Sequence, residues 1–396
     1  MDLIIHPHSL HGEIDIIPSK SLAHRALICA AFADRPTEIL CRDTSRDMDA
    51  TAGCLKALGA DIIRTERGYS VSPARDIPAQ ATLNCCDSGS TLRFLLPVAG
   101  ALGVAATFRM EGRLPQRPLS PLWEEMERMG CTLSRPTENT ILCSGRLLPG
   151  EYSIPGNISS QYITGFMLAL PLIQQESRLT ITGNTESRPY IDLTRQVISC
   201  FGGDTDHPGK NAFQSPDYIE IEGDWSNGAF FYAAGVLGAD LTIHGLSASS
   251  LQGDRAAARW IPLLREQNCT IDASDIPDLV PILSIVAATN HGAVFTNIQR
   301  LRIKESDRVE STVAMIRNLG GEAYATGNSL TVHGTGLVGG TVDAMNDHRI
   351  AMSAAIASIV CKQDVRILGA QCVEKSYPRF WEEFSRLGGT YEQYLR

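Results

Sequence analysis

The chain has 396 residues, of which 43% are hydrophobic and 20% charged, as expected for a globular protein of two or three domains. Its net charge of −9 argues against a general nucleic-acid-binding surface. No run of 18 consecutive apolar residues occurs, and the first residues lack the basic and apolar segments of a signal peptide. We therefore expect neither nucleic acid nor a membrane among its partners.

The first predicted helix begins near residue 18, in the sequence PSKSLAHRALICAAFA. Ser19 or Ser21 can cap its first turn, and residues 22–33 are mostly small or apolar. Lys20 and Arg25 are unusual there, because a cation at the positive end of a helix dipole costs about 0.3–1 kcal/mol. They are either tolerated surface charge or the holders of a small anion at the free N–H groups.

Five further segments repeat this pattern of a polar start followed by about a dozen mostly apolar residues, and the six begin near residues 18, 87, 157, 223, 275 and 346. A second, amphipathic helix follows in each; in one of them Val309, Val313, Ile316 and Leu319 share a face. Short β-type runs such as AATFRM and DLTIHG lie between the helices. The sequence thus predicts six βα-rich units, each with a buried first helix and a covering second helix.

The count of units predicts an α/β fold, and the division into two lobes of three units each rests on this count together with the family resemblance given below. The last unit is short, and the 17 residues before PSKS could supply its missing strand. We therefore expect an N-terminal lobe of residues 19–221 and a C-terminal lobe of residues 1–18 with 222–396. No Pro/Gly linker marks either crossing.

The starts of five of the six helices carry more polar side chains than capping requires. They hold Ser19, Lys20, Ser21 and Arg25; Asp87, Ser88, Gly89, Ser90, Thr91 and Arg93; Asn157, Ser159, Ser160 and Gln161; Asp275 and Asp278; and Asn346, Asp347, His348 and Arg349. Capping explains one Ser or Asp in each helix. It does not explain the cations, because a buried guanidinium without a partner is too costly to keep.

Further charged residues lie between a strand and the second helix of a unit. IKESDRVES carries Lys304, Glu305, Asp307 and Arg308, although a solvated first turn capped by Ser306 would also explain it. Other loops carry Arg117, Ser187, Arg188, Tyr190, Glu374 and Lys375. Because these loops occupy equivalent places in the units, several of them could converge on one face.

Eleven cysteines occur, none of them in a CxxC pair. Cys29, Cys200 and Cys361 fall in apolar runs and are predicted to be buried free thiols. Adjacent Cys85 and Cys86 cannot easily form a bridge. This use of cysteine is typical of a reducing compartment, so we expect a cytoplasmic protein.

The chain contains seven motifs in order: PSKSLAHRAL, DSGSTLRFL, QRPLSPL, ISSQYITG, SRPYIDLT, IKESDR and NDHRIAM. Through them it resembles the family of 5-enolpyruvylshikimate-3-phosphate synthases, enzymes of the shikimate pathway to aromatic amino acids. The resemblance implies a two-lobed inside-out α/β barrel, each lobe having three βαβαββ-type repeats with buried parallel helices. Helix N-termini would face a cleft where shikimate 3-phosphate and phosphoenolpyruvate bind and the lobes close.

The resemblance also implies roles for individual residues, with the N-terminal lobe supplying mainly shikimate 3-phosphate contacts. The implied contacts to shikimate 3-phosphate are Ser21, Arg25, Ser159, Ser160, Gln161, Ser187, Asp278 and Lys304, with Tyr190 nearby. Those to phosphoenolpyruvate are Lys20, Gly89, Arg117, Gln161, Arg308, Arg349 and Lys375. No metal or organic cofactor is implied, and we expect a monomer.

The implied reaction is transfer of the enolpyruvyl group to the 5-hydroxyl of shikimate 3-phosphate through a tetrahedral intermediate, with release of phosphate. The acid–base candidates are Asp278 at the hydroxyl and Glu305, with Lys20 near, at the methylene carbon. The sequence departs from the usual family pattern at His24, Asp87 and the pair Arg300–Leu301. These departures bear on affinity rather than on the reaction.

Three other functions were compared with this one. The sister family acting on UDP-N-acetylglucosamine usually has a reactive cysteine in a loop where this chain reads MEGRLPQRPLSP, without cysteine. The net charge and the lack of a nucleotide motif argue against an RNA-end cyclase. Retention of Asp278 and Glu305 argues against a non-catalytic, anion-binding relative.

Overall fold

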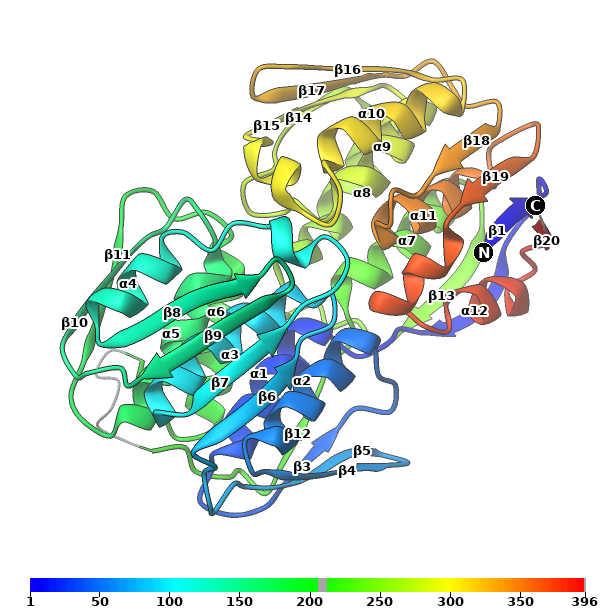
Figure 1. Ribbon diagram of the computed structural model, residues 1–396. Helices are drawn as coiled ribbons and strands as arrows, with labels where there is room; N and C mark the ends of the chain where they lie inside the picture. Colours follow the sequence, from blue (N-terminus) through cyan, green and yellow to red (C-terminus); the bar gives the residue numbers. More distant parts are fainter. Residues whose placement is uncertain (206–211, 395–396) are drawn as a thin grey trace. The chain divides into compact units, whose positions relative to one another are not determined.

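The computed structural model describes residues 1–205 and 212–394. The chain forms two compact units, one of Pro18–Glu222 and one of Met1–Ile17 with Gly223–Arg396 (Figure 1). Each unit has its own hydrophobic core of aliphatic and aromatic side chains. We name them by their place along the chain: the inner unit is residues 18–222, and the outer unit contains both chain ends.

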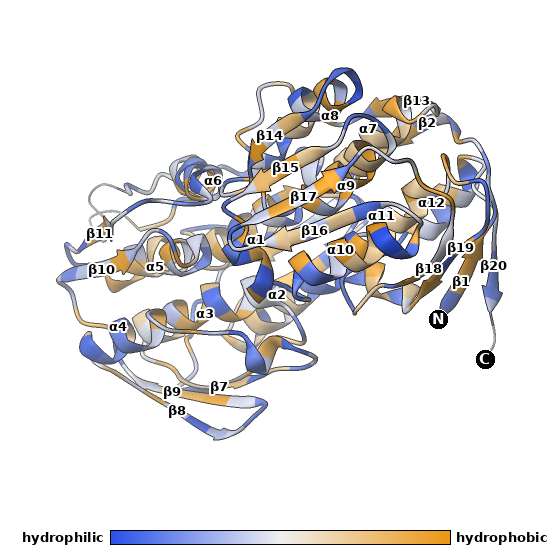
Figure 2. Ribbon diagram, turned by 90° about the horizontal axis from the view of Figure 1, so that it is seen from above, coloured by the Kyte–Doolittle hydropathy of each residue, from blue (hydrophilic) through white to orange (hydrophobic). Residues whose placement is uncertain are grey.

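Within the described residues, six helices are buried nearly all round, three in each unit. They are α1 (Lys20–Ala31), α3 (Gly89–Leu102), α5 (Ser160–Ile173), α7 (Trp225–Val236), α9 (Val280–Thr289) and α11 (His348–Ala357). Small and apolar residues fill them, so that every face can pack; α9 is apolar along most of its length (Figure 2). The six buried helices expected from the sequence are confirmed.

Six covering helices alternate with the buried ones. They are α2 (Arg46–Ala57), α4 (Leu122–Arg128), α6 (Arg188–Cys200), α8 (Ala257–Glu266), α10 (Arg308–Asn318) and α12 (Phe380–Arg386). In α10 the predicted apolar face of Val309, Val313 and Ile316 is buried. Cys200 was predicted to be buried, and this is wrong: it ends α6 on the exposed side of an amphipathic helix. Among the described helices, none is long and apolar enough to cross a lipid bilayer.

Each buried helix leads into the second strand of a parallel pair. The pairs are β12 (Tyr218–Glu220) with β3 (Thr37–Leu40), β6 (Gln80–Asn84) with β7 (Ala105–Arg109), β10 (Glu151–Pro155) with β11 (Arg178–Thr182), β2 (His11–Asp15) with β13 (Asp240–His244), β14 (Cys269–Asp272) with β15 (Ala293–Thr296), and β18 (Gly340–Asp343) with β19 (Val365–Leu368). A helix between parallel strands is the usual crossover connection.

In two of these pairs, the strand that precedes the buried helix in sequence is not the strand that pairs with the one after it. In sequence β2 precedes α1, yet it pairs with β13 of the outer unit. Likewise β12 precedes α7, yet it pairs with β3 of the inner unit. The chain passes between the units twice, and both passages occur directly before a buried helix.

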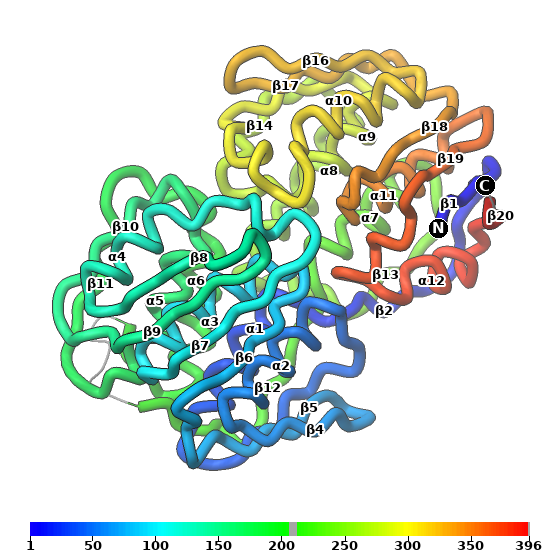
Figure 3. Tube along the Cα trace, viewed as in Figure 1, coloured from blue at the N-terminus to red at the C-terminus, as the bar shows by residue number. Residues whose placement is uncertain are grey.

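Four parallel pairs are widened into four-stranded sheets by antiparallel strands. The added strands are β4 (Asp61–Thr65), β5 (Gly68–Ser72), β8 (Cys131–Thr137), β9 (Thr140–Gly145), β16 (Glu322–Thr326), β17 (Ser329–His333), β1 (Asp2–Ile5) and β20 (Tyr391–Tyr394). The first strand β1 lies between β19 and β20, which brings the two ends of the chain together (Figure 3). Over the described residues, β10–β11 and β13–β2 stay two-stranded.

Candidate active site

The second turn of α1 carries a guanidinium that the fold surrounds with neutral groups. Arg25 is only 2% exposed. Its Nε donates to Thr194 Oγ1 at 2.8 Å, and its Nη2 donates to Thr164 Oγ1 at 3.3 Å and to the carbonyl of Tyr190 at 3.1 Å. Burial lowers the pKa of Arg25 to about 10, and within the described residues no carboxylate pairs with it. The charge of Arg25 is therefore left for an anion to balance.

Arg25 also joins the first and third repeats of the inner unit. Thr164 lies on α5 and Thr194 on α6, so one side chain of α1 contacts both helices of the third repeat. Ser187, at the N-cap of α6, is buried and has a φ of 52°. A left-handed conformation is unusual for serine and is found most often at turns and binding sites. Ser160 begins α5 and is buried as well.

Lys20, at the first position of α1, is paired with an acid. Its Nζ lies 3.0 Å from Oδ2 of Asp47 in the first turn of α2, and both side chains are mostly buried. Ser19 is the N-cap residue, but no side-chain capping hydrogen bond forms there, so the cap expected of Ser19 or Ser21 is wrong. Lys20 thus lies at a helix start that has no side-chain acceptor of its own.

The beginnings of α3 and α5 meet through an amide and two arginines. Nη1 of Arg93 donates to Oε1 of Gln161 at 3.1 Å, and Nε2 of Gln161 donates to Oγ of Ser90 at 3.0 Å. A Cβ on Gly89 would lie 2.5 Å from Nη1 of Arg93 and 2.7 Å from Nη1 of Arg117. Only glycine at the start of α3 lets both guanidinium groups approach the backbone there.

Ser159 has a local role at the start of α5. Its hydroxyl, at the N-cap, accepts a hydrogen bond from the backbone N–H of Gln161 at 3.3 Å. This is ordinary capping and orients the residue that bridges α3 and α5. Among the residues predicted in the inner unit, Arg25 donates to the carbonyl of Ser21, while Gln161 contacts Arg93 and Ser90.

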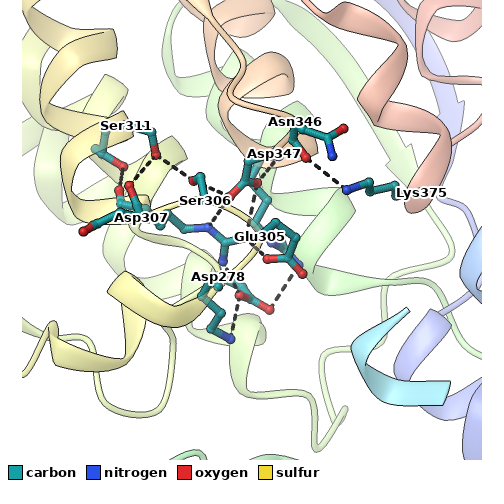
Figure 4. A network of polar contacts seen from close by, with 12 residues as sticks. Asp278, Glu305, Ser306, Asp307, Ser311, Asn346, Asp347 and Lys375 are labelled. Carbon is teal, nitrogen blue, oxygen red and sulfur yellow. Dashed lines mark hydrogen bonds and ion pairs between the residues drawn. The ribbon is translucent and has the colours of Figure 1, made fainter. Parts of the chain in front are cut away.

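In the outer unit a fully buried arginine holds three carboxylates. Arg308 begins α10 and has no exposed surface. Its Nε donates to Oδ2 of Asp347 at 2.9 Å, its Nη1 to Oδ1 of Asp278 at 2.6 Å and its Nη2 to Oε2 of Glu305 at 2.6 Å. Figure 4 shows these three carboxylates turned toward a common centre. Burial alone would lower the pKa of Arg308, but the charges of Asp347, Glu305 and Asp278 outweigh burial and raise that pKa above its usual value. Arg308 is therefore positively charged.

Asp278, just before α9, is the residue on which the cations of this cluster converge. It accepts from Nζ of Lys304 at 3.3 Å and from Nη2 of Arg349 at 3.1 Å, besides Arg308. Burial by itself would raise the pKa of Asp278, but the charges of Arg349, Lys304 and Arg308 outweigh it and hold that pKa well below its usual value. Burial lowers the pKa of Lys304. Asp278 is therefore ionised and able to accept a proton.

Asp347 belongs to the same network but was not among the predicted contacts. It is fully buried, caps α11 by accepting from the backbone N–H of Arg349 at 3.0 Å, and also accepts from Ser306 Oγ at 3.0 Å. The cap of α10 is Asp307, so the alternative of a first turn capped by Ser306 is wrong. The NDHR motif indicated a polar helix start but not its pairing with Arg308.

Lys375 lies at the same helix start. It ends the short helix η4 (Ala370–Lys375), is buried, and its Nζ donates to the carbonyl of Asn346 at 3.1 Å. Asn346 has a φ of 57° and directly precedes the cap of α11. The outer unit thus gathers Asp278, Lys304, Glu305, Arg308 and Arg349 in one network, with Lys375 at its edge. In the described part of the chain, no group of three or more His, Cys, Asp or Glu side chains is arranged so that it could hold a metal ion.

The family model of EPSP synthase (3-phosphoshikimate 1-carboxyvinyltransferase) matches residues 4–384. This chain belongs to the EPSP synthase family. It is 37% identical to the 3-phosphoshikimate 1-carboxyvinyltransferase of Clostridium kluyveri, with 98% of each chain covered. It is 38% identical to the enzyme of that name from Clostridium perfringens strain ATCC 13124, again with 98% of each covered.

Solved structures agree on the fold of the EPSP synthase family. An EPSP synthase from Acinetobacter baumannii matches with a TM-score of 0.79 at 20% identity, with both chains covered completely. The enolpyruvyl transferase NikO from Streptomyces tendae matches with a TM-score of 0.74 at 16% identity, covering 99% of this chain and 98% of its own. The family and the α/β fold expected from the sequence motifs are confirmed, and the alternative of a UDP-N-acetylglucosamine transferase is not favoured.

Proposed function

We propose that this chain transfers the enolpyruvyl group of phosphoenolpyruvate to the 5-hydroxyl of shikimate 3-phosphate and releases phosphate, as a transferase of aromatic amino acid biosynthesis. Membership of the EPSP synthase family and the names of its relatives support this activity. Among the structural observations, the strongest support is that Asp278 and Glu305 share one buried guanidinium. Two carboxylates and several cations in one cluster suit a reaction that moves protons between anionic substrates.

The reaction has two stages. A proton is added to the methylene carbon of phosphoenolpyruvate while the 5-hydroxyl loses its proton and its oxygen bonds to the neighbouring carbon. The resulting ketal phosphate then loses phosphate by cleavage of its carbon–oxygen bond and loses a proton from the new methyl group. The double bond re-forms, and the product is an enol ether.

We assign shikimate 3-phosphate to Arg25, whose hydrogen-bond partners are neutral, and to the hydroxyl groups near it. The uncompensated charge of buried Arg25 favours an anionic group of this substrate. The proposed contacts are Ser21, Arg25, Ser159, Ser160, Gln161 and Ser187 from the inner unit, with Tyr190 nearby, and Asp278 and Lys304 from the outer unit. The inner unit thus supplies most contacts to this substrate.

For phosphoenolpyruvate we assign the remaining cations. The proposed contacts are Lys20, Gly89, Arg117, Gln161, Arg308, Arg349 and Lys375. Arg308 is saturated by carboxylates, so its contact with the anion requires Glu305 to give up its place on Nη2. Once released, the Glu305 carboxylate can take up a proton from solvent and then deliver it to the methylene carbon, which couples binding of the anion to the first proton transfer.

The same charge balance governs Asp278. Its low pKa makes it a weak base as long as Arg349, Lys304 and Arg308 all face it. An anion that engages Arg308 and Arg349 withdraws their positive charge from Asp278, and the pKa of Asp278 rises. We propose that Asp278 then takes the proton of the 5-hydroxyl, while Glu305, with Lys20 near, acts at the methylene carbon. General acid–base help is worth about 10²–10⁴-fold in rate for each group.

A phosphate-release assay tests the activity directly. Phosphoenolpyruvate is supplied with shikimate 3-phosphate, with UDP-N-acetylglucosamine, or alone, and we expect phosphate only with shikimate 3-phosphate. Release with the nucleotide sugar, or none with either acceptor, would contradict the proposal. Asp278→Asn should abolish most turnover. The matched control is Asp272→Asn in the same unit. The carboxylate of Asp272 accepts hydrogen bonds from the backbone N–H of Ser274 and from the side-chain amide of Asn297.

We also propose that the chain works as a monomer in the cytoplasm. Its eleven cysteines are all free, which suits a reducing compartment. Light scattering of the purified protein gives the molar mass in solution. A mass near 43.0 kDa supports the monomer, whereas twice that value contradicts it.

A further inference from the structure

The start of α7, the fourth buried helix, carries a polar cluster that the proposed reaction does not use. Asp224 caps the helix by accepting from the backbone N–H of Asn227 at 2.9 Å. The backbone N–H of Trp225 donates to Oε1 of Gln252 at 3.0 Å. Directly after Gln252 comes the short helix η2 (Gly253–Ala256), which packs against α7 and carries Asp254.

Asp254 is a carboxyl group buried at this helix start. It is 1% exposed, and its Oδ2 accepts a short hydrogen bond from Oγ of Ser226 in the first turn of α7. Its Oδ1 is buried and has no hydrogen-bond partner among the described residues. An ionised oxygen without a donor is costly to bury, so this environment favours the protonated carboxyl.

Asp254 acts on the same arginine as Asp278. Its electrostatic neighbours are Asp278 before α9, Arg349 on α11 and Asp224 at the cap of α7. Burial raises the pKa of Asp254 to about 7; Asp278 and Asp224 raise it too, and Arg349 and the Ser226 hydroxyl oppose them. Arg349 in turn donates from Nη2 to Oδ2 of Asp278 at 3.1 Å. Both carboxyl groups therefore interact electrostatically with one guanidinium, and Asp278 also accepts its hydrogen bond.

The two arginines that follow Asp254 on η2 and α8 contact other groups. Arg255, on η2 itself, donates from Nη1 to the carbonyl of Ala248, and Arg259 on α8 stacks on the ring of Trp260 at 4.5 Å. Of the arginines named here, Arg349 is the one that acts on Asp254.

We propose that Asp254 is a positioning residue for phosphoenolpyruvate: protonated, it leaves Arg349 to Asp278 and the incoming anion, and ionised, it draws Arg349 away. The inference rests on the proposed function, because it takes Arg349 as a contact of that substrate. Loss of the Asp254 proton adds a negative charge beside Arg349, and this weakens binding of an anion without touching the reacting atoms.

The test is the pH dependence of KM for phosphoenolpyruvate at saturating shikimate 3-phosphate. If only the protonated form binds well, the apparent affinity falls in proportion to the protonated fraction. With a pKa of about 7, that fraction is roughly one tenth at about pH 8, so KM should rise about tenfold from its acid value. Because phosphate esters titrate near pH 6, the ratio of wild type to variant isolates the protein group.

Three variants sharpen this test. Asp254→Asn keeps the shape and lacks the charge, so its KM should stay at the acid value of the wild type, with kcat nearly unchanged. Ser226→Ala removes a hydrogen bond that lowers the pKa of Asp254, so the rise in KM should move to higher pH. Asp272→Asn should follow the wild type. The same rise in Asp254→Asn as in the wild type, or no shift in Ser226→Ala, would overturn the proposal.

A readout without turnover separates this inference from the proposed function. Carboxyl carbon NMR of aspartate-labelled protein follows the ionisation of Asp254 in the free enzyme. A resonance that titrates near neutral pH and is missing from Asp254→Asn supports the assignment even if no phosphate is released. Its absence from the wild-type spectrum overturns the assignment even if the enzyme is fully active.

Discussion

Both units bury cations near the starts of helices but surround them with different partners. In the inner unit Arg25 donates to hydroxyls and carbonyls. In the outer unit Arg308 and Arg349 donate to carboxylates. A neutral acceptor orients a guanidinium and leaves its charge uncompensated, whereas a carboxylate cancels it.

This difference indicates a division of labour between the units. The charge left over in the inner unit favours tight binding of an anionic substrate. In the proposed mechanism, the balanced cluster of the outer unit lets carboxylates exchange partners and move protons when an anion arrives. Lys20, paired with Asp47, differs from Arg25 and resembles the cations of the outer unit in this respect.

Loss of a carboxylate from the outer cluster should have the largest effect. Glu305→Gln keeps a hydrogen-bond acceptor for Arg308 but cannot donate a proton as an acid, so kcat should fall about a hundredfold or more. Binding of shikimate 3-phosphate should change little, as measured by calorimetry. The control is Glu310→Gln, in which an exposed glutamate of α10 loses its pairing with Arg302. Near-normal turnover in Glu305→Gln would remove it from the proton transfers.

Loss of the uncompensated cation in the inner unit should act on binding instead. Arg25→Gln removes a charge-assisted contact worth about 1.5–3 kcal/mol, so the Kd for shikimate 3-phosphate should rise roughly tenfold to a hundredfold. Arg195→Gln, on the exposed face of α6, is the matched control. If Arg25→Gln lowered kcat and left Kd unchanged, the two units would not differ as described.

A methyl group at the start of α3 should have a smaller effect. Gly89→Ala places a Cβ against Arg93 and Arg117, and both guanidinium groups must shift. KM for phosphoenolpyruvate should rise about tenfold, the effect of roughly 1.4 kcal/mol. Gly235→Ala is the control, because a Cβ on that helical glycine of α7 meets no atom within 4 Å. Equal kinetics in the two variants would show that the space beside Gly89 is not used.

The smallest effect should be a displacement of a pH profile. Asp278 has a lowered pKa in the free enzyme, so the base is present down to low pH and is lost only as the pH falls through that value. Anion binding raises the pKa of Asp278, so the acid limb of kcat should lie at higher pH than the acid limb of kcat/KM. Coincident limbs would mean that the bound anion leaves the charge on Asp278 unchanged.

The sequence predicted the parts of the molecule that depend on local pattern. Helices rich in small and apolar residues had to be buried, and amphipathic segments such as α10 had to cover them. Pairings between distant residues could not be read in this way. Asp347 lies 39 residues from Arg308, and only the fold shows that one caps a helix and also neutralises the other.

The same limit explains what was missed or mistaken elsewhere. The two crossings were expected from the count of units, but the partners of the crossing strands, β13 for β2 and β3 for β12, depend on pairing over most of the chain, which no local pattern contains. Asp254 lies in a short loop sequence and becomes notable only through its burial against Ser226. Cys200 was misjudged because hydropathy along the sequence does not say which side of α6 its last turn presents.

The most direct test is a crystal structure of Glu305→Gln with shikimate 3-phosphate and phosphoenolpyruvate bound, because slow turnover preserves both substrates. The account predicts that Arg25 lies within hydrogen-bond distance of shikimate 3-phosphate, and that Lys20, Arg308 and Arg349 lie within that distance of phosphoenolpyruvate. A structure in which both substrates are bound and these cations keep only their present protein partners would contradict it.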